Sequence, residues 1–346
     1  MRRQRCRRTM PLAVTAAVPL SLLAGCGQVE APEPAGGPSV TETVTSTEVT
    51  STEPVTSTGG SGGSDRGEGG RSAPDDGQPD DSTRTTGPGE AAQEAESARA
   101  LEGIADAARA SAEGLEGEVG VMVIDLQTGQ QAAYQEDLPV YPASFYKLFV
   151  AYSALHLVDD GELGLDDVVV GSGPCATVGS ALGYAIRVSD NSCADRLAGH
   201  VGWEVVESHL RELGLEGTTF SPVDLGTHHA VGDVVTTTAE DVAMMLRLLA
   251  QGELLSEESS AVLLGELREQ YFTSGLSEAL GGDVIFKHKL GTLANVSHDA
   301  GIVLDGERRY VVAVTTGGWS HGAEGQAWPV LNAVGEALRE YVESWR

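Results

Sequence analysis

The sequence predicts an α+β domain in which helices cover one antiparallel sheet and an all-helical subdomain lies beside that sheet. Three observations predict it: two strand patterns precede a long helical middle, three strand patterns follow it, and a helical pattern stands at each end. Strands on both sides of a helical segment share one sheet when the two ends of the chain return to each other. We place this domain at residues 96–346, which is long enough for one substantial core.

The first half of the domain begins with a helix and two strands. Glu94–Glu113 is rich in alanine and poor in turn residues, which predicts the first helix. Val119–Asp125 and Gln130–Gln135 follow as strands, and the next helix opens at Ser144. From there the chain is predicted to be helical with loops as far as about Leu255.

Within that helical middle one helix shows a clear apolar face. The face consists of residues at helical spacing, namely Val242, Met245, Leu246 and Leu249. Thr238, three residues before Asp241, is predicted to cap the start of this helix. We interpret this segment as core rather than as part of a site.

The second half of the domain returns to strands. Val284–Lys289, Ala300–Leu304 and Tyr310–Thr316 carry alternating or continuous aliphatic residues, which predicts three successive antiparallel strands. Trp328–Trp345 is predicted to be the closing helix. We expect a turn at His298 and Asp299, just before the second of these strands, with a cap or a place at the edge of the cleft as the alternative.

The first 25 residues are typical of an export signal. Five arginines precede an apolar run from Pro11 to Leu23, which is too short to span a bilayer as a stable helix. The small residues before Cys26 resemble a bacterial lipobox, so we expect cleavage at Cys26 and lipid attachment to it; an ordinary cleaved signal is the alternative. The expected location is outside the cytoplasm of a bacterium, anchored by lipid to the cell membrane.

Residues 26–95 are predicted to be a disordered tether between the lipid and the domain. Valine is the only large aliphatic residue there, and the segment is rich in Thr, Ser, Gly, Pro and acidic residues, so it cannot bury a core. Loss of the five signal arginines changes the formal charge from -29 to -34. This acidity argues against nucleic acid as a partner and against electrostatic attraction to anionic lipid.

Three short motifs carry the predicted chemistry. Ser144 and Lys147 stand three residues apart at a helix start, so they share one face, and the amine can activate the hydroxyl. Ser189-Asp190-Asn191 follows, and Lys289-Leu290-Gly291-Thr292 comes much later, between strand patterns. Each motif alone is common, but their order and separations are informative.

Together these motifs resemble the Ser-x-x-Lys, Ser-Asp-Asn and Lys-Thr-Gly set of class A β-lactamases and penicillin-binding proteins. The strand pair of residues 119–135 is similar to the opening hairpin of the same superfamily, and the resemblance covers about residues 96–346. It implies a β-lactamase/transpeptidase-like fold, in which the nucleophile helix runs between the two parts and the cleft lies along their seam.

The resemblance implies a role for each site residue. Ser144 is the expected nucleophile, Lys147 the base, and Ser189 the proton relay to the leaving nitrogen. Lys289 is expected to attract a substrate carboxylate, while Asn191 holds Lys147 and a substrate amide. The backbone N–H groups of Ser144 and Thr292, beside Gly291, would form the oxyanion hole.

Two departures from the family pattern bear on turnover. Leu290 replaces the family's Thr or Ser, so a hydroxyl that would bind the substrate carboxylate is missing; Thr292 is a possible substitute. The family's Glu-x-x-Leu-Asn loop, which carries the deacylating carboxylate, is also missing. The corresponding stretch of residues 220–234 offers only Asp224 and Asp233 as acids. The sequence therefore supports acylation better than deacylation.

Cysteine and histidine usage indicates a disulfide rather than a metal centre. Cys175 and Cys193 form the only pair in the domain, and outside the cytoplasm a disulfide is expected, with two buried thiols as the alternative. Such a bond would brace the turn that carries Ser189. The histidines (His228, His229, His288 and His298) lack the spacing of a metal motif, so we predict no metal and no cofactor.

Three functions remain open from the sequence. The leading hypothesis is hydrolysis of β-lactam rings by a class A-type serine enzyme. The first alternative is a penicillin-binding-type D,D-peptidase or transpeptidase acting on peptidoglycan peptides, and the second is a lipoprotein that binds β-lactams or muropeptides without turnover. The expected partners are therefore a small β-lactam or a cell-wall peptide, and we expect a monomer.

Overall fold

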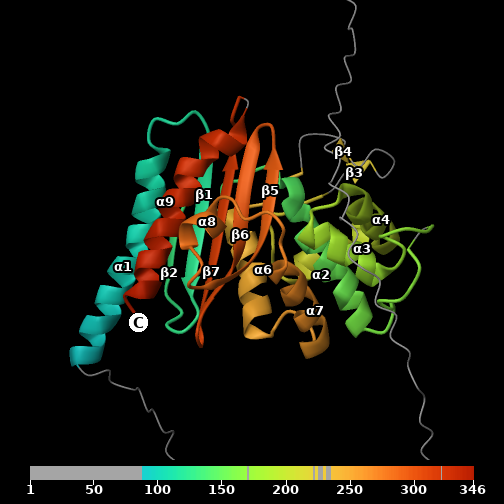
Figure 1. The fold of residues 1–346 in the computed structure, drawn as a ribbon, viewed down its shortest axis with the longest axis horizontal. Coiled ribbons are helices and arrows are strands. Elements are labelled where there is room, and N and C mark those ends of the chain that lie inside the picture. The colour runs from blue at the N-terminus through green and yellow to red at the C-terminus, as the bar shows by residue number, and fades with distance from the viewer. Residues whose placement is uncertain (1–87, 170, 221–222, 225–228, 231–234, 321) are drawn as a thin grey trace, which may run out of the picture. The chain divides into compact units, whose positions relative to one another are not determined.

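The computed structural model describes residues 88–346 except 170, 221–222, 225–228, 231–234 and 321. Its centre is a five-stranded sheet of order β2-β1-β7-β6-β5, and every neighbouring pair is antiparallel (Figure 1). The strands are β1 (Glu118–Asp125), β2 (Gln131–Tyr134), β5 (Ile285–Leu293), β6 (Val296–Asp305) and β7 (Arg308–Gly317). The predicted α+β class and its single antiparallel sheet are confirmed.

The two ends of the domain meet where β1 pairs with β7. The pairing runs from Glu118 opposite Gly317 to Asp125 opposite Tyr310. Seven of the eight residues of β1 are buried, because the sheet is covered on both faces. Met122 and Ile124 belong to one apolar cluster and Val121 and Val123 to the other, as alternation along a strand requires. Strands far apart in the sequence thus form the middle of one core.

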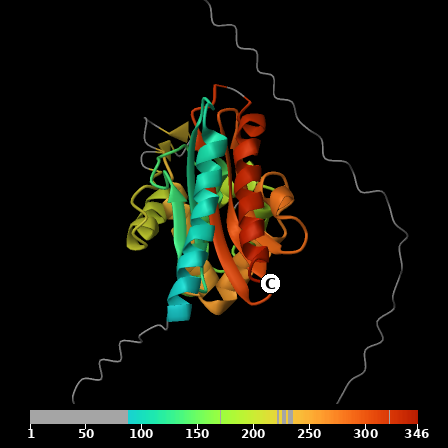
Figure 2. The same cartoon turned by 90° about the vertical axis from the view of Figure 1, so that its left-hand side faces the viewer.

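One face of the sheet is covered by α1 (Pro88–Ala112) and α9 (Ala323–Glu343), which lie side by side in Figure 2, and by the short α8 (Leu276–Leu280). The predicted first helix exists, but it begins at Pro88 rather than at Glu94. Residues 88–95, which we assigned to the tether, are therefore helical. Proline is favourable at the first helical position, and the alanines, glutamates and glutamine that follow are good helix formers.

The other face carries the helical part of the domain. Its elements are the 3₁₀ turn η1 (Ala143–Phe145) and the helices α2 (Tyr146–Asp159), α3 (Val178–Arg187), α4 (Asn191–Val201), α5 (Trp203–Glu212), α6 (Ala239–Gln251) and α7 (Glu257–Arg268). Thr238 caps α6 by accepting a hydrogen bond from the Asp241 N–H, as predicted. The consecutive residues 147–155 of α2 are all buried, so this helix runs through the interior.

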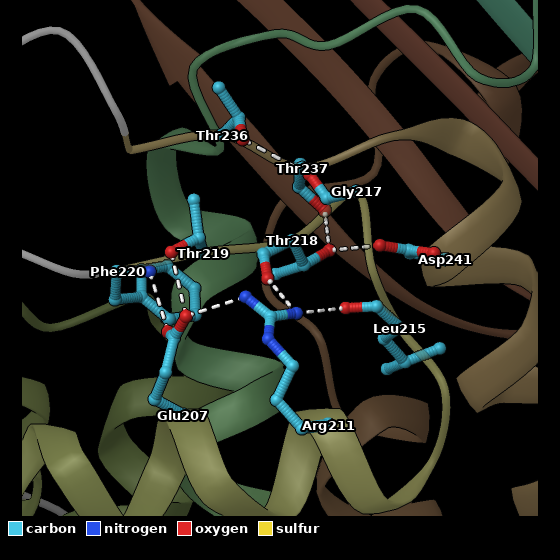
Figure 3. Close-up of polar contacts among 10 residues, drawn as sticks. All are labelled: Glu207, Arg211, Leu215, Gly217, Thr218, Thr219, Phe220, Thr236, Thr237 and Asp241. Atoms are coloured by element: carbon cyan, nitrogen blue, oxygen red, sulfur yellow. Dashed lines mark hydrogen bonds and ion pairs between the residues drawn. The ribbon is translucent and has the colours of Figure 1, made fainter.

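A small hairpin, β3 (Val223–Asp224) and β4 (His229–Ala230), belongs to the segment between α5 and α6, in which residues 221–222, 225–228 and 231–234 lie outside the described residues. Its two ends are tied together at Thr219 and Thr236, which exchange backbone hydrogen bonds of 3.0 and 3.1 Å. The Glu207 carboxylate of α5 accepts bonds from Arg211 (2.6 Å), the Thr219 hydroxyl (2.7 Å) and the Phe220 N–H (2.8 Å), as Figure 3 shows. Glu207, paired with Arg211 on α5, thus anchors the start of this loop at Thr219 and Phe220.

The turn expected at His298 and Asp299 is wrong. Both residues lie inside β6 and are fully buried. The sheet tolerates them because each finds a partner: His298 bonds the Tyr141 carbonyl and the Thr316 N–H, and Asp299 bonds His288.

The amino-terminal predictions, including the signal, Cys26 and the tether up to residue 87, fall outside the described residues. Among the helices that the structure does describe, none combines the length and the apolar composition needed to cross a bilayer.

Candidate active site

The site begins where the chain enters the buried helix α2. Ser144 lies in η1, directly before α2, so its backbone N–H is at the positive end of that helix. Ala143 adopts a left-handed φ of 44°, which is unusual for a residue with a side chain. Strain of this kind persists where the surroundings fix the backbone, and here it lies directly before Ser144.

Lys147 lies one turn after Ser144 and reaches four oxygen atoms. Its Nζ is 3.2 Å from Ser144 Oγ, 3.0 Å from Ser189 Oγ, 2.5 Å from the Ser189 carbonyl and 2.7 Å from Asn191 Oδ1. An ammonium group has only three protons, so these four oxygens compete for them. Once Lys147 loses a proton, its lone pair is within reach of the Ser144 hydroxyl proton.

The environment of Lys147 favours the neutral amine. Its side chain is 1% exposed, and burial lowers the pKa of Lys147 to about 8, while the nearby carboxylates of Asp190 and Asp195 act in the opposite direction. Roughly one tenth of such a group is neutral at pH 7. The pKa of Lys147 is therefore in the range that a general base needs.

Ser189 links the nucleophile to both lysines. Its hydroxyl donates to Ser144 Oγ at 2.9 Å and accepts from Lys147 and, at 3.1 Å, from Lys289. Its φ of 56° is left-handed, which brings the hydroxyl and the carbonyl of the same residue onto Lys147. Asp190, next in the chain, caps α4 through the Cys193 N–H at 2.8 Å. The whole Ser-Asp-Asn turn is thus fixed by the start of α4.

A disulfide joins Cys175 and Cys193, as predicted. Cys193 is fully buried and lies two residues after Asn191, in the first turn of α4. The bond connects that turn to the chain before α3, so it restrains the segment that carries Ser189 and Asn191.

Lys289 approaches the same hydroxyl from the sheet. It lies on β5, whose outer edge pairs with no other strand among the described residues and lies next to η1. Its Nζ donates to Ser189 Oγ and, at 2.6 Å, to the Leu290 carbonyl. Burial and the charge of Lys147 lower the pKa of Lys289 to about 7, while Asp299 raises it. Lys289 is thus the second cation of the site and electrostatically coupled to the first.

Gly291 allows the backbone of β5 to lie close to Ser144. A Cβ atom at this position would lie 3.3 Å from the Ser144 nitrogen and 3.4 Å from atoms of Phe145 and His298, which is tighter than ordinary contact. The free edge of β5 and the Ser144 N–H therefore lie close together. This is the arrangement in which two backbone N–H groups can bind one oxyanion.

Leu290 stands where the family motif has Thr or Ser, and Thr292 lies two residues further along β5. Leu290 is opposite Asp299 in the sheet register and Thr292 opposite Ser297. The Thr292 hydroxyl is enclosed and has no hydrogen-bond partner among the described residues, so it can still accept or donate a bond. The hydroxyl that Leu290 lacks thus has a possible substitute two residues further along β5.

Two supporting residues lie beside the network, and only Asp195 escaped the sequence analysis. His298 is fully buried beneath the site, and burial lowers its pKa to about 4, so it is neutral and its two ring nitrogens bond the Tyr141 carbonyl and the Thr316 N–H. Its ring also contacts that of Phe145, with centroids 5.1 Å apart. Asp195 bonds the Tyr146 hydroxyl at 3.3 Å. Asp195 could have been found, because it lies four residues after Asn191 on the same helix face.

The absence of a metal stays a prediction, and the described side chains offer few places for one. One group of potential ligands lies within 4.8 Å of one another among the described side chains, namely Cys175, Asp190 and Cys193, but the disulfide uses both sulfur atoms. His288 and His298 are engaged by Asp299 and by backbone groups. Asp233, one of the two acids considered for deacylation, lies outside the described residues, as does the side chain of Asp224.

The structure therefore assembles Ser144, Lys147, Ser189, Asn191 and Lys289 into one connected hydrogen-bond network, as the motifs predict. Chemically, it joins a serine hydroxyl, an amine with a lowered pKa, a hydroxyl relay and a second cation. Such a set can transfer an acyl group to a serine.

Known structures share this architecture. The structure of PBP-A aligns with a TM-score of 0.63 at 20% identity, covering 70% of this chain and 97% of that one. A β-lactamase from Sphaerobacter thermophilus aligns with a TM-score of 0.62 at 23% identity, covering 70% and 97%. A point mutant of a class A β-lactamase from the last common ancestor of Gram-negative bacteria gives 0.64 at 25%, covering 70% and 100%.

A comparison with curated protein sequences found no match. The sequence profile of the Beta-lactamase enzyme family, in contrast, matches residues 102–342, which include every residue of the network. The fold, the order of the motifs and this match agree, and the chain belongs to the Beta-lactamase enzyme family.

Proposed function

We propose that this protein is a serine hydrolase that forms an acyl-enzyme on Ser144 and opens β-lactam rings in the manner of class A β-lactamases. The observation that carries the proposal is the position of Lys147, a buried amine with a pKa lowered to about 8 and 3.2 Å from Ser144 Oγ. A hydroxyl beside an amine that ionises near neutral pH is an activated nucleophile.

Acylation follows from the network in one sequence of steps. Neutral Lys147 takes the Ser144 proton as Ser144 Oγ attacks the lactam carbonyl, and the oxyanion is held by N–H groups of Ser144 and β5. Collapse of this intermediate breaks the C–N bond. The proton moves from Lys147 through Ser189 Oγ, which is 3.0 Å away, to the leaving nitrogen. Each step uses side chains and backbone of the chain itself, so the proposal requires no cofactor.

Hydrolysis of the acyl-enzyme requires a group that activates water. The family's glutamate is missing from the sequence, and Asp224 and Asp233 are the acids of the corresponding segment. This absence favours a second candidate, a penicillin-binding-type D,D-peptidase or transpeptidase on peptidoglycan peptides, which needs no such glutamate. A domain that binds β-lactams or muropeptides without turnover is the third candidate.

The test is a time course of intact mass after mixing the purified protein with benzylpenicillin. Ser144→Ala is the inactive comparison, and Ser208→Ala, an exposed serine on α5, is the matched control that should behave as wild type. An adduct that forms and disappears within minutes, while penicilloate accumulates, supports a β-lactamase. A persistent adduct supports the peptidase or the binding protein. Absence of both an adduct and penicilloate on wild type would refute Ser144 as a nucleophile toward β-lactams.

We also propose that the domain acts outside the cytoplasm as a lipid-anchored monomer. The support is the signal-like segment of residues 1–25 followed by Cys26, together with the disulfide, which is typical of oxidising compartments. Mass spectrometry of the amino-terminal peptide of the mature protein tests it, since an unacylated peptide beginning elsewhere than Cys26 would refute the anchor. Size-exclusion chromatography with light scattering tests the monomer.

A further inference from the structure

Four apolar side chains are exposed beside the Ser189 turn, where a soluble domain would ordinarily bury them or carry polar residues. They are Tyr184, Val188, Tyr271 and Phe272, with exposed fractions of 39%, 40%, 74% and 41%, and we refer to them as the Ser189 rim. Single exposed apolar residues need no explanation, but a group of them beside the turn that carries Ser189 indicates a contact surface for a ligand.

The rim is built from two segments that are firmly joined. The Tyr271 N–H donates to the Arg187 carbonyl at 2.9 Å, and the Gln270 side chain, which is 7% exposed, donates to the Ile186 carbonyl at 3.0 Å. The rings of Tyr271 and Phe272 meet edge to face, with centroids 5.4 Å apart. The aromatic pair is therefore held against the end of α3, two residues before Ser189.

Two cations near the rim, Arg187 and Lys289, are already engaged. Arg187 forms an ion pair with Glu266 at 2.7 Å, and its guanidinium lies 5.9 Å from the centre of the Tyr184 ring. Lys289 is buried and donates to Ser189 and to the Leu290 carbonyl. The rim thus offers aromatic faces and aliphatic surface to a ligand, without a free charge among these side chains.

Ser189 is the group that hands a proton to the leaving nitrogen in the proposed reaction, so the leaving side of the substrate lies toward the rim. We propose that the Ser189 rim binds an aromatic or otherwise apolar substituent on the leaving-group side of the substrate, through Tyr271 and Phe272. This inference rests on the proposed function for the orientation of the substrate. It names a substrate class: acyl donors whose departing half carries an apolar ring.

The experiment uses two cephalosporins with the same thienylacetyl acyl group and different C3 substituents. Nitrocefin carries a dinitrostyryl group at C3, and cephalothin carries a small acetoxymethyl group. Binding is measured by equilibrium dialysis to Ser144→Ala protein, which cannot be acylated at that serine, with and without the double change Tyr271→Ala and Phe272→Ala. Trp328→Ala, which removes an aromatic side chain on α9 that is 40% exposed, is the matched control.

We expect the double change to raise the Kd of nitrocefin about tenfold, because an aromatic contact of this kind contributes on that order, and to change that of cephalothin less than about twofold. Trp328→Ala should leave both values unchanged, and Tyr271→Phe with Phe272 intact should retain nitrocefin binding. The inference is overturned by an unchanged Kd for nitrocefin, by equal losses for both compounds, or by no binding of nitrocefin to Ser144→Ala. Binding to this variant combined with neither adduct nor penicilloate on wild type overturns only the acyl-enzyme proposal.

Discussion

Lys147 and Lys289 should titrate as a coupled pair. Replacing Lys289 should therefore shift the pH dependence of acylation that Lys147 imposes. Lys147 must lose its proton to act as a base, so acylation should rise as pH increases through its pKa of about 8. Lys289→Gln removes the nearby positive charge. Repulsion between two cations is mutual, so this change should raise the pKa of Lys147 and move the rising limb of the profile to higher pH.

The size of that shift follows from the geometry. Both Nζ atoms contact Ser189 Oγ, at 3.0 and 3.1 Å, so they are at most about 6 Å apart. With an effective dielectric constant of about 20, two unit charges at about 6 Å repel by about 3 kcal/mol, or about two pKa units. Lys289 itself has a pKa of about 7, so it is only partly charged near pH 7. About half of that charge is present at pH 7, so acylation at pH 7 should slow up to roughly tenfold, and the shift should become smaller toward pH 8, where Lys289 is mostly neutral.

The assay is the rate of acylation by a penicillin methyl ester, followed by intact mass between about pH 6 and pH 9.5, a range that brackets both lysine pKa values. The ester has no carboxylate, so the contact of Lys289 with a substrate carboxylate does not enter. Lys289→Arg keeps the charge and is the matched control, for which the limb should stay near its wild-type position. A limb that does not move in Lys289→Gln, or that moves to lower pH, would refute the coupling between the lysines.

Three further outcomes are expected. Gly291→Ala should slow benzylpenicillin acylation at least about tenfold, because its Cβ would lie 3.3 Å from the Ser144 nitrogen and disturb the oxyanion site; wild-type rates would contradict the close approach of β5. Cys175→Ser should lower the free energy of unfolding by about 3 kcal/mol in urea titrations, and reductant should then have no further effect. Glu207→Gln should lower the free energy of unfolding by about 1–3 kcal/mol in the same assay, because it weakens three hydrogen bonds. Glu204→Gln, at an exposed position of α5, should change that free energy by almost nothing, and equal losses for the two variants would refute the role of Glu207 in anchoring the loop.

Much of the fold could be predicted because its signals are local. The strands Val119–Asp125 and Tyr310–Thr316 are continuous aliphatic runs, and the structure places them next to each other in the sheet. The start of α1 was missed because residues 88–95 contain none of the large apolar residues that mark a packed helix. His298 and Asp299 were mistaken for a turn, because single polar residues look like turn formers until their buried partners are known.

The residues of the site could be predicted from the sequence, but the contacts between them could not. Ser144 and Lys147 are neighbours by helical geometry alone, which the sequence shows directly. The contacts of Ser189 with Lys147 and Lys289 join residues 42 and 100 positions apart, so only the packing of α4 against α2 and of β5 against η1 creates them. The lowered pKa values depend on burial in that packing, and no local pattern in the sequence reports it.

The position of β5 at the edge of the sheet has a consequence for whether a strand of another molecule can pair with it. An unpaired strand edge is a template for adding a strand from another molecule, and it is a common origin of aggregation. Here the chain before α2 lies against that edge, and its side chains leave room at Gly291 for little more than a backbone. A strand from a second copy could therefore add to this part of β5 only if η1 moved away from it.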